Sequence, residues 1–147
     1  MSDAEVAEFL DRQRVAICAT NGNDGWPHLM PLWYVLRDGE LWSWTYAKSQ
    51  KVRNLERDDR VTVEVENGHE YHELRGVMIR AHCILHRELA IVAGIGQELA
   101  VRYGGDDAAV GPEASEVFER QAAKRVALQF KPESIATWDH SKLGGVY

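Results

Sequence analysis

A short segment in the first third of the chain gathers side chains suited to holding a phosphate group. It contains Thr45, Lys48, Ser49, Gln50, Lys51 and Arg53, which supply hydroxyls, an amide and three cations around an expected helix start. The first turn of a helix offers free N–H groups and the positive end of its dipole, and lysines add charge-assisted hydrogen bonds. The pattern favours a phosphate site; a solvated helix start with scattered Lys and Arg is the alternative.

The acidic character of the whole chain makes this cationic cluster stand out. There are 17 Lys and Arg against 23 Asp and Glu, so the formal net charge is −6. A general nucleic-acid-binding protein carries a basic face that neutralises phosphates, so this composition argues against that class. A small oligonucleotide-binding barrel would suit the abundant Trp and Tyr but not the charge.

Other titratable side chains do not assemble into a second centre. His82 and His86 fall on one face of an expected strand, but about 13 Å of strand separates them, too far to share one ion. The histidines and glutamates at 69–73 flank a turn, and we expect them to be solvated. We assign no metal site and no catalytic residue, so any enzymatic chemistry is expected to come from a cofactor.

Apolar alternation and turn signals predict a mainly β domain. The expected strands are Val15–Thr20, Trp26–Leu36, Glu40–Tyr46, Arg60–Glu66, Tyr71–Arg87 and Arg125–Thr137; the expected helices are Ser2–Arg12, one starting near Ser49, Leu89–Tyr103 and Pro112–Ala123, followed by a tail, Trp138–Tyr147. A proline removes a ladder donor, so Pro31 predicts an edge strand or a bulge. In the third strand, Leu41, Ser43 and Thr45 are expected on one face.

Six short strands joined largely by hairpins predict an antiparallel sheet, which closes into a small barrel with peripheral helices. We see no linker or repeat and expect one domain over residues 1–147. No apolar run approaches the roughly 20 residues that cross a bilayer. The acidic N-terminus is unlike a signal or transit peptide. Cys18 and Cys83 are expected to be buried free thiols, so we expect a cytoplasmic protein.

The order of several pieces resembles the pyridoxamine 5′-phosphate oxidase-like superfamily, the flavin-binding split β-barrels. The matching pieces are Trp26–Tyr34, Asp38–Trp42, Ser49–Val61 and Glu73–Gly76, and together they extend the resemblance over nearly the whole chain. Within that superfamily the sequence is most similar to short members that use the deazaflavin coenzyme F-420 or FMN. The resemblance implies a six-stranded antiparallel split β-barrel of the FMN-binding type.

The same resemblance implies a set of cofactor-binding residues. They are Met30, Pro31, Leu32, Trp33, Ser43 and Trp44 along the ring, and Thr45, Lys48, Ser49, Gln50, Lys51 and Asn54 near the phosphate, with Trp138 and Lys142 contributed by the partner subunit of a homodimer. Packing in the core or between subunits is the alternative for the tryptophans.

The expected function is that of an oxidoreductase, which transfers hydride between the bound cofactor and a small organic acceptor. A non-catalytic flavin, deazaflavin or haem carrier of the same fold is the alternative. The cations at 48–53 suit the polyglutamate tail of F-420, which favours that cofactor over FMN. There is no extended Arg-rich substrate-phosphate site, which argues against a true pyridoxamine phosphate oxidase. Tyr34, Tyr46 and His140 are considered as proton donors, but none is assigned.

Overall fold

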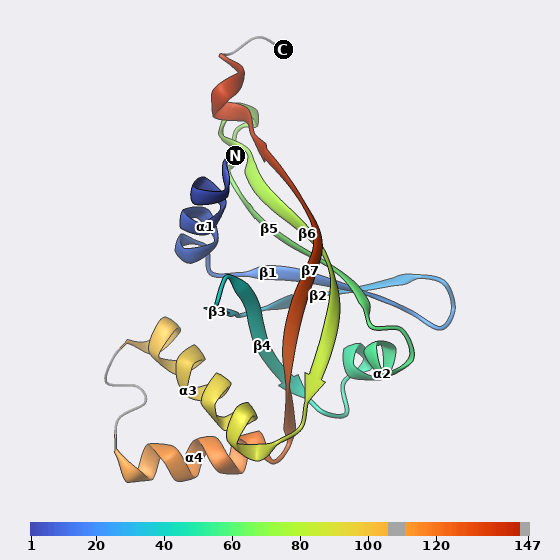
Figure 1. Ribbon diagram of the computed structural model, residues 1–147, viewed down its shortest axis with the longest axis vertical. Coiled ribbons are helices and arrows are strands. Elements are labelled where there is room, and N and C mark those ends of the chain that lie inside the picture. The colour runs from blue at the N-terminus through green and yellow to red at the C-terminus, as the bar shows by residue number, and fades with distance from the viewer. Residues whose placement is uncertain (106–110, 145–147) are drawn as a thin grey trace.

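The computed structural model describes residues 1–105 and 111–144, which form a curved sheet flanked by helices (Figure 1). The elements in chain order are α1 (Asp3–Arg12), β1 (Ala16–Asn21), β2 (Pro27–Leu32), β3 (Val35–Arg37), β4 (Glu40–Tyr46), α2 (Gln50–Arg57), β5 (Arg60–Asn67), the 3-10 turn η1 (Tyr71–Glu73), β6 (Arg75–His86), α3 (Leu89–Gly104), α4 (Pro112–Ala122), β7 (Arg125–Asp139) and the 3-10 turn η3 (His140–Leu143).

The seven described strands make one antiparallel sheet in the order β2-β1-β5-β6-β7-β4-β3. Its two outermost strands, β2 and β3, are neighbours in the chain and are joined only by Trp33 and Tyr34. A link of that length spans roughly 10 Å at most. The sheet must therefore curl until its edges meet, which confirms the predicted mainly β, antiparallel split barrel.

The sheet has one strand more than the six expected, because the segment 26–36 forms two strands. Between them, Tyr34 turns into the barrel and is fully buried. Its hydroxyl donates to the backbone oxygens of Leu10 (2.6 Å) and Gln13 (3.1 Å), and its backbone N–H donates to the hydroxyl of Tyr103 (2.9 Å). The break sends β2 and β3 to opposite edges. The prediction that Pro31 lies in an edge strand is confirmed.

Two strand boundaries differ from the prediction for local reasons. β6 begins at Arg75 because residues 71–73 form a 3-10 turn, where the Glu73 carboxylate accepts from the N–H groups of His69 and Glu70. β7 continues to Asp139, so Trp138 lies in the strand and not in a tail. Its indole ring occupies the space where a side chain at Gly76, its cross-strand partner, would be.

The curved sheet separates two apolar cores. One fills the barrel, and the other lies between the sheet and the α3–α4 pair. β4 contributes to both, since Leu41 belongs to the barrel core and Trp42 to the second. This alternation along β4 confirms the predicted separation of its faces and sends Trp44 toward α3.

Burial of the cysteines and of Tyr34 predicts a loss of stability in alkali. Burial raises the pKa of Cys18 from 9.0 to about 12 and that of Tyr34 from 10.0 to about 12, and it also raises the pKa of Cys83. The unfolded chain releases these protons near the ordinary values. Above about pH 9 the folded state therefore holds more protons, and the free energy of unfolding falls as the pH rises.

Urea unfolding between pH 8 and 11 is expected to show this fall. The double variant Cys18→Ala/Cys83→Ala should be less stable at pH 8 but should show a shallower decline. Equal slopes for the two proteins would contradict a contribution from the thiols.

Candidate functional site

The barrel is open between the free edges of β2 and β4. Among the described strands, β2 pairs with β1 alone, and β3 covers the edge of β4 only as far as Trp42. Residues 43–46 and the outer side of β2 thus present backbone groups without a neighbouring strand. An edge of this kind supplies N–H donors and C=O acceptors to whatever lies beside it.

Contacts at both ends show that these two edges border one slot. At one end, Ser43 Oγ donates to the backbone oxygen of Trp33 (2.6 Å). At the other end α2 bonds β4 and β1, the strand that pairs with β2. Lys51 bonds Thr45 of β4, and Asn54 bonds Thr20, the β1 residue paired with His28 of β2.

The middle of the slot is apolar and aromatic. The slot contains a cavity of ≈ 340 Å³, lined by Val15, Pro31, Leu32, Trp33, Trp44 and Leu99. A separate cavity of ≈ 390 Å³ lies beside α1. Trp33 stacks on Tyr103 with ring centroids 4.3 Å apart and planes 5° from parallel, yet it is 58% exposed. Concave sites with aromatic walls suit planar ligands. The structure thus brings together Pro31, Leu32, Trp33 and Trp44, while their binding role stays a prediction.

Trp44 is held by packing on the α3 side of β4. Its ring contacts the α3 backbone at Gly96, where a side chain would collide with it. The Arg125 guanidinium lies 4.5 Å from the ring centre of Trp44 and 4.3 Å from that of Tyr46. Trp44 therefore serves the second core as well as the slot. Trp42 is buried and stacks on His86, so it is a packing residue.

Lys51 is the most unusual side chain at the site. It is only 4% exposed, and its ammonium donates one hydrogen bond, to Thr45 Oγ1 at 3.3 Å. No described carboxylate forms an ion pair with it. Burial lowers its pKa, while the nearby Cys18 raises it by a smaller amount. A buried cation with unused donors is costly unless an anion compensates it.

The start of α2 takes the form the sequence predicted. Ser49 is the N-cap, and its hydroxyl accepts from the Val52 N–H (3.4 Å). Asn54 is fully buried and donates to Thr20 Oγ1 (3.0 Å), and it accepts from the exposed Gln50 (2.9 Å). Asn54 therefore has a structural role, because it ties α2 to β1 beneath the slot.

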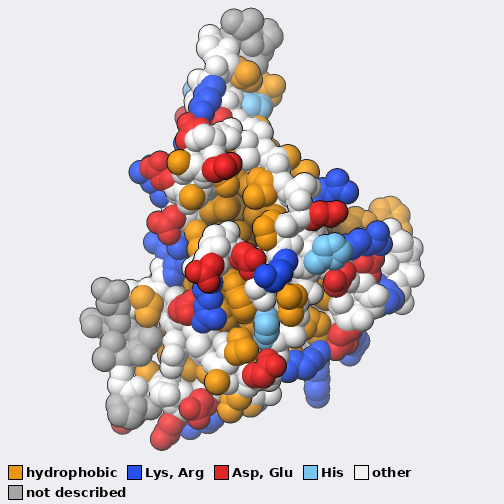
Figure 2. Space-filling view, in the orientation of Figure 1, with side chains coloured by type: hydrophobic (Ala, Val, Ile, Leu, Met, Phe, Trp, Pro, Cys, Tyr) orange, Lys and Arg blue, Asp and Glu red, His pale blue; other side chains and the backbone are white. Residues whose placement is uncertain are grey.

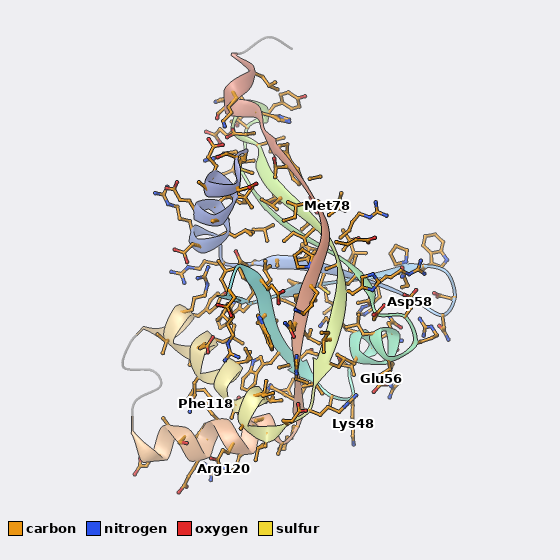
Figure 3. All side chains as sticks on the ribbon, in the orientation of Figure 1. Lys48, Glu56, Asp58, Met78, Phe118 and Arg120 are labelled. Carbon is orange, nitrogen blue, oxygen red and sulfur yellow. The ribbon has the colours of Figure 1, made fainter. Side chains whose placement is uncertain are left out.

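Further cations surround the helix start, and two of them come from a distant part of the sequence. Lys48 lies beside α2 (Figure 3), and the Ala47 N–H donates to the backbone oxygen of Lys124 (3.0 Å). The pairing of β4 with β7 places Arg125 opposite Tyr46. Sequence analysis missed Lys124 and Arg125. Their only signal would have been the β4–β7 pairing, which no local pattern predicts.

The β2 wall carries Met30, which is exposed, and His28, whose Nδ1 is buried without a described hydrogen-bond partner. Both pair with β1 residues that face the barrel, Cys18 and Thr20. They therefore lie on the Lys51 side of the sheet. The orphaned imidazole nitrogen and the partly used Lys51 ammonium fit a site that accepts a polar ligand.

Two predicted residues lie far from this slot within the same chain. Trp138 packs on Gly76, and Lys142 pairs with Glu5 of α1 at 2.6 Å, both at the end of the molecule near the termini (Figure 1). Neither can contact a ligand beside Lys51 of its own chain. Their predicted role requires a second subunit.

None of the three side chains considered as proton donors lines the apolar cavity of the slot. Tyr34 is wrong as a candidate, since it is buried and bonds the end of α1. His140 Nδ1 bonds the backbone oxygen of Tyr71 near the C-terminus. Tyr46 is exposed next to Arg125. The described residues contain no cluster of metal-ligating side chains, and none of the described helices could span a membrane.

The fold and the slot define an antiparallel split β-barrel, open between two strand edges. The sequence model of the pyridoxamine 5′-phosphate oxidase family matches residues 2–139. The chain therefore belongs to this family, as the sequence motifs indicated.

Solved structures agree with this assignment. The chain is similar to the conserved hypothetical protein Rv2991 of Mycobacterium tuberculosis, with 37% identity, coverage of 100% of this chain and 90% of that one, and a TM-score of 0.90. It shares its fold with an F420 reductase (22% identity, 88% and 94% coverage, TM-score 0.67) and with the haem storage protein HutZ of Vibrio cholerae (15% identity, 93% and 93% coverage, TM-score 0.70). No match to a curated protein was found.

Proposed function

We propose that the protein is an oxidoreductase that binds coenzyme F-420, or alternatively FMN, in the slot between β2 and β4. The observation that carries the proposal is the buried Lys51, which forms no ion pair with a described carboxylate and bonds Thr45, the neighbour in β4 of Trp44 in the aromatic cavity. A phosphate there would supply the missing charge, and Thr45 would orient the ammonium toward it.

The protein's own residues would bind and orient the cofactor and exclude water. Trp33 is fixed by Tyr103 on one face, so its exposed face is already placed to stack on a ring. The free backbone groups of β4 would bond the polar edge of that ring. The bound cofactor would supply hydride transfer to a small organic acceptor.

The surrounding cations favour F-420 over FMN. Lys48, Arg53 and Lys124 form no ion pair with a described residue. Both cofactors carry a phosphate, but only F-420 carries a polyglutamate tail, and such a tail would find counter-charges here.

The double variant Lys48→Gln/Arg53→Gln is therefore expected to weaken the binding of F-420 several-fold and to change the binding of FMN little. The reason is that exposed ion pairs contribute about 0.2–1 kcal/mol each. The difference should shrink at high salt. Isothermal titration at two salt concentrations measures it. Equal losses for both cofactors would argue against a tail site.

A homodimer with cofactor sites at the interface is part of the proposal. The β1–β2 hairpin projects from the barrel next to the slot (Figure 1) and exposes Trp26, Leu29 and Met30, with Trp26 at 76%. A second copy would cover these residues and bring its own Trp138 and Lys142 to the slot. Light scattering measures the mass, and Trp26→Ser should shift it toward the monomer.

Spectroscopic titration with each cofactor tests the function. We expect saturable binding, followed by oxidation of the reduced cofactor when acceptors are added. The second candidate is a carrier of flavin, deazaflavin or haem, which is favoured by the lack of a titratable side chain among the residues lining the slot's apolar cavity. Binding without turnover above the protein-free rate, across a broad acceptor panel, would establish the carrier. Absence of binding would contradict both.

A further inference from the structure

The barrel has a second opening, on the side of α1, which the proposed function does not use. β7 pairs with β4 only over residues 125–130, whereas its pairing with β6 continues to Asp139. β4 begins at Glu40, so beyond Lys131 β7 has no β4 residue beside it, and its register with β6 shifts between Arg80 and Ala81 of β6. α1 lies across the resulting gap (Figure 1). It does not fill the gap, and a cavity of ≈ 390 Å³ remains.

The floor of this cavity is the barrel core itself. Leu10, Leu41, Ile79 and Phe130 line it, and all four are otherwise nearly buried. Ile135 stands at the mouth and is 51% exposed, although it is paired with the inward-facing Ile79. Figure 2 shows hydrophobic side chains gathered between α1 and the β6–β7 pair on this face. The volume is at the lower end of the range for small-molecule sites.

The charged groups among the lining residues are two carboxylates, those of Glu40 and Asp3, and one ammonium, that of Met1. The carboxylate of Glu40 accepts from Gln129 (2.7 Å) and Lys131 (3.2 Å), and these bonds lower its pKa, so it stays ionised. Asp3 is exposed at the start of α1. Thr137 contributes the one neutral polar side chain among the lining residues, and its oxygen accepts from the Met1 ammonium (2.9 Å).

These groups decide which occupant fits. A second copy placed here by two-fold symmetry would bring the Asp3 and Glu40 carboxylates of both copies together, which opposes docking. A ligand carboxylate would meet the same repulsion, which the single Met1 ammonium offsets only in part. A small uncharged molecule can enter while both rim carboxylates stay in water, and the Thr137 hydroxyl can donate to an oxygen on it.

We propose that this cavity binds a small, uncharged, mainly apolar molecule with one carbonyl or hydroxyl oxygen, such as an aliphatic alcohol or ketone. The site shares no lining residue with the slot between β2 and β4. It would therefore be occupied independently of the cofactor.

Methyl NMR of the cofactor-free protein titrated with 1-octanol tests the proposal. The methyl signals of Ile79 and Ile135 should shift saturably, while those of Ile95, beneath α3, should not. Octanoate should bind more weakly than 1-octanol, because two carboxylates face its charge against one ammonium. The exposed alanines of α1 provide a matched pair: Ala7 lines the cavity and Ala4 does not. Ala7→Trp should weaken the binding of 1-octanol at least tenfold, and Ala4→Trp should leave its affinity unchanged.

Ile135→Trp, at the exposed mouth, serves as a second blocking variant if Ala7→Trp lowers the melting temperature. Unchanged affinity in a stable blocking variant, equally tight octanoate, or shifts spread over Ile95 would overturn the proposal. The proposal would also be overturned if the wild-type protein does not bind 1-octanol and forms a dimer that Ala7→Trp disrupts. A second copy of the chain would then cover the cavity. Loss of cofactor binding in a separate assay would bear only on the slot.

Discussion

Replacing Lys51 by Met is expected to weaken cofactor binding about tenfold to a hundredfold. The buried ammonium has one neutral hydrogen-bond partner, Thr45 Oγ1 at 3.3 Å, so its other donors are available to a phosphate. A charge-assisted bond of this kind contributes roughly 1.5–3 kcal/mol, and each 1.36 kcal/mol is a factor of ten. Titration followed by absorbance or fluorescence measures the change in Kd.

The same substitution is expected to leave the cofactor-free protein as stable as before or more stable. Met keeps most of the volume of the side chain and removes a buried charge that no described carboxylate neutralises. Replacing buried charges by apolar groups of similar size is often neutral or stabilising. A residue that costs stability but strengthens binding is held for its function.

Arg80 offers a control, since it is an exposed cation on β6 without a described ion pair. Arg80→Met removes the same charge from the chain, and it should change neither Kd nor the urea midpoint appreciably. If Lys51→Met binds normally, the phosphate site is misplaced. If it unfolds instead, Lys51 stabilises the apo protein through contacts that the geometry does not reveal.

Local sequence patterns predicted most of the secondary structure, because caps, turns and apolar periodicity depend on interactions between residues close in sequence. The helix predicted over Ser2–Arg12 forms as α1, with Ser2 Oγ accepting from the Glu5 N–H in a capping box, and the α2 N-cap falls on Ser49. The segment 26–36 was mistaken for one strand because its break depends on Tyr103 and α1, which are distant in sequence. Tertiary contacts of this kind decide where a continuous apolar pattern is interrupted.

The candidate site also combines features that local sequence patterns indicate with features that depend on tertiary contacts. The structure brings Pro31, Trp33 and Trp44 to one cavity, as expected for a contiguous motif, and bonds Lys51 to Thr45 beside Trp44, while their binding role stays a prediction. The burial of Lys51 could not be predicted, because a Lys near a helix start is normally solvated. Arg125 was also missed, because only the β4–β7 register brings it beside Trp44.

Substituting two glycines of α3 by alanine is expected to change stability in opposite directions. At Gly96 a Cβ would lie 2.6 Å from Cη2 of Trp44, so the indole or the helix must move, at a cost of about 1–3 kcal/mol. The gain in helix propensity, roughly 0.8–1 kcal/mol, offsets only part of this cost. At Gly94 the Cβ would meet only Nη2 of Arg37, at 3.4 Å, so the propensity gain remains.

Urea unfolding should therefore show Gly94→Ala more stable than the wild type and Gly96→Ala less stable, with the two separated by about 2 kcal/mol. The pair also tests whether Trp44 forms a wall of the ligand slot. Because Gly96→Ala displaces the Trp44 ring and Gly94→Ala does not, only the former should alter cofactor affinity and Trp fluorescence. A Gly96→Ala protein that is destabilised but binds with wild-type affinity would show that Trp44 packs against α3 without contacting the cofactor.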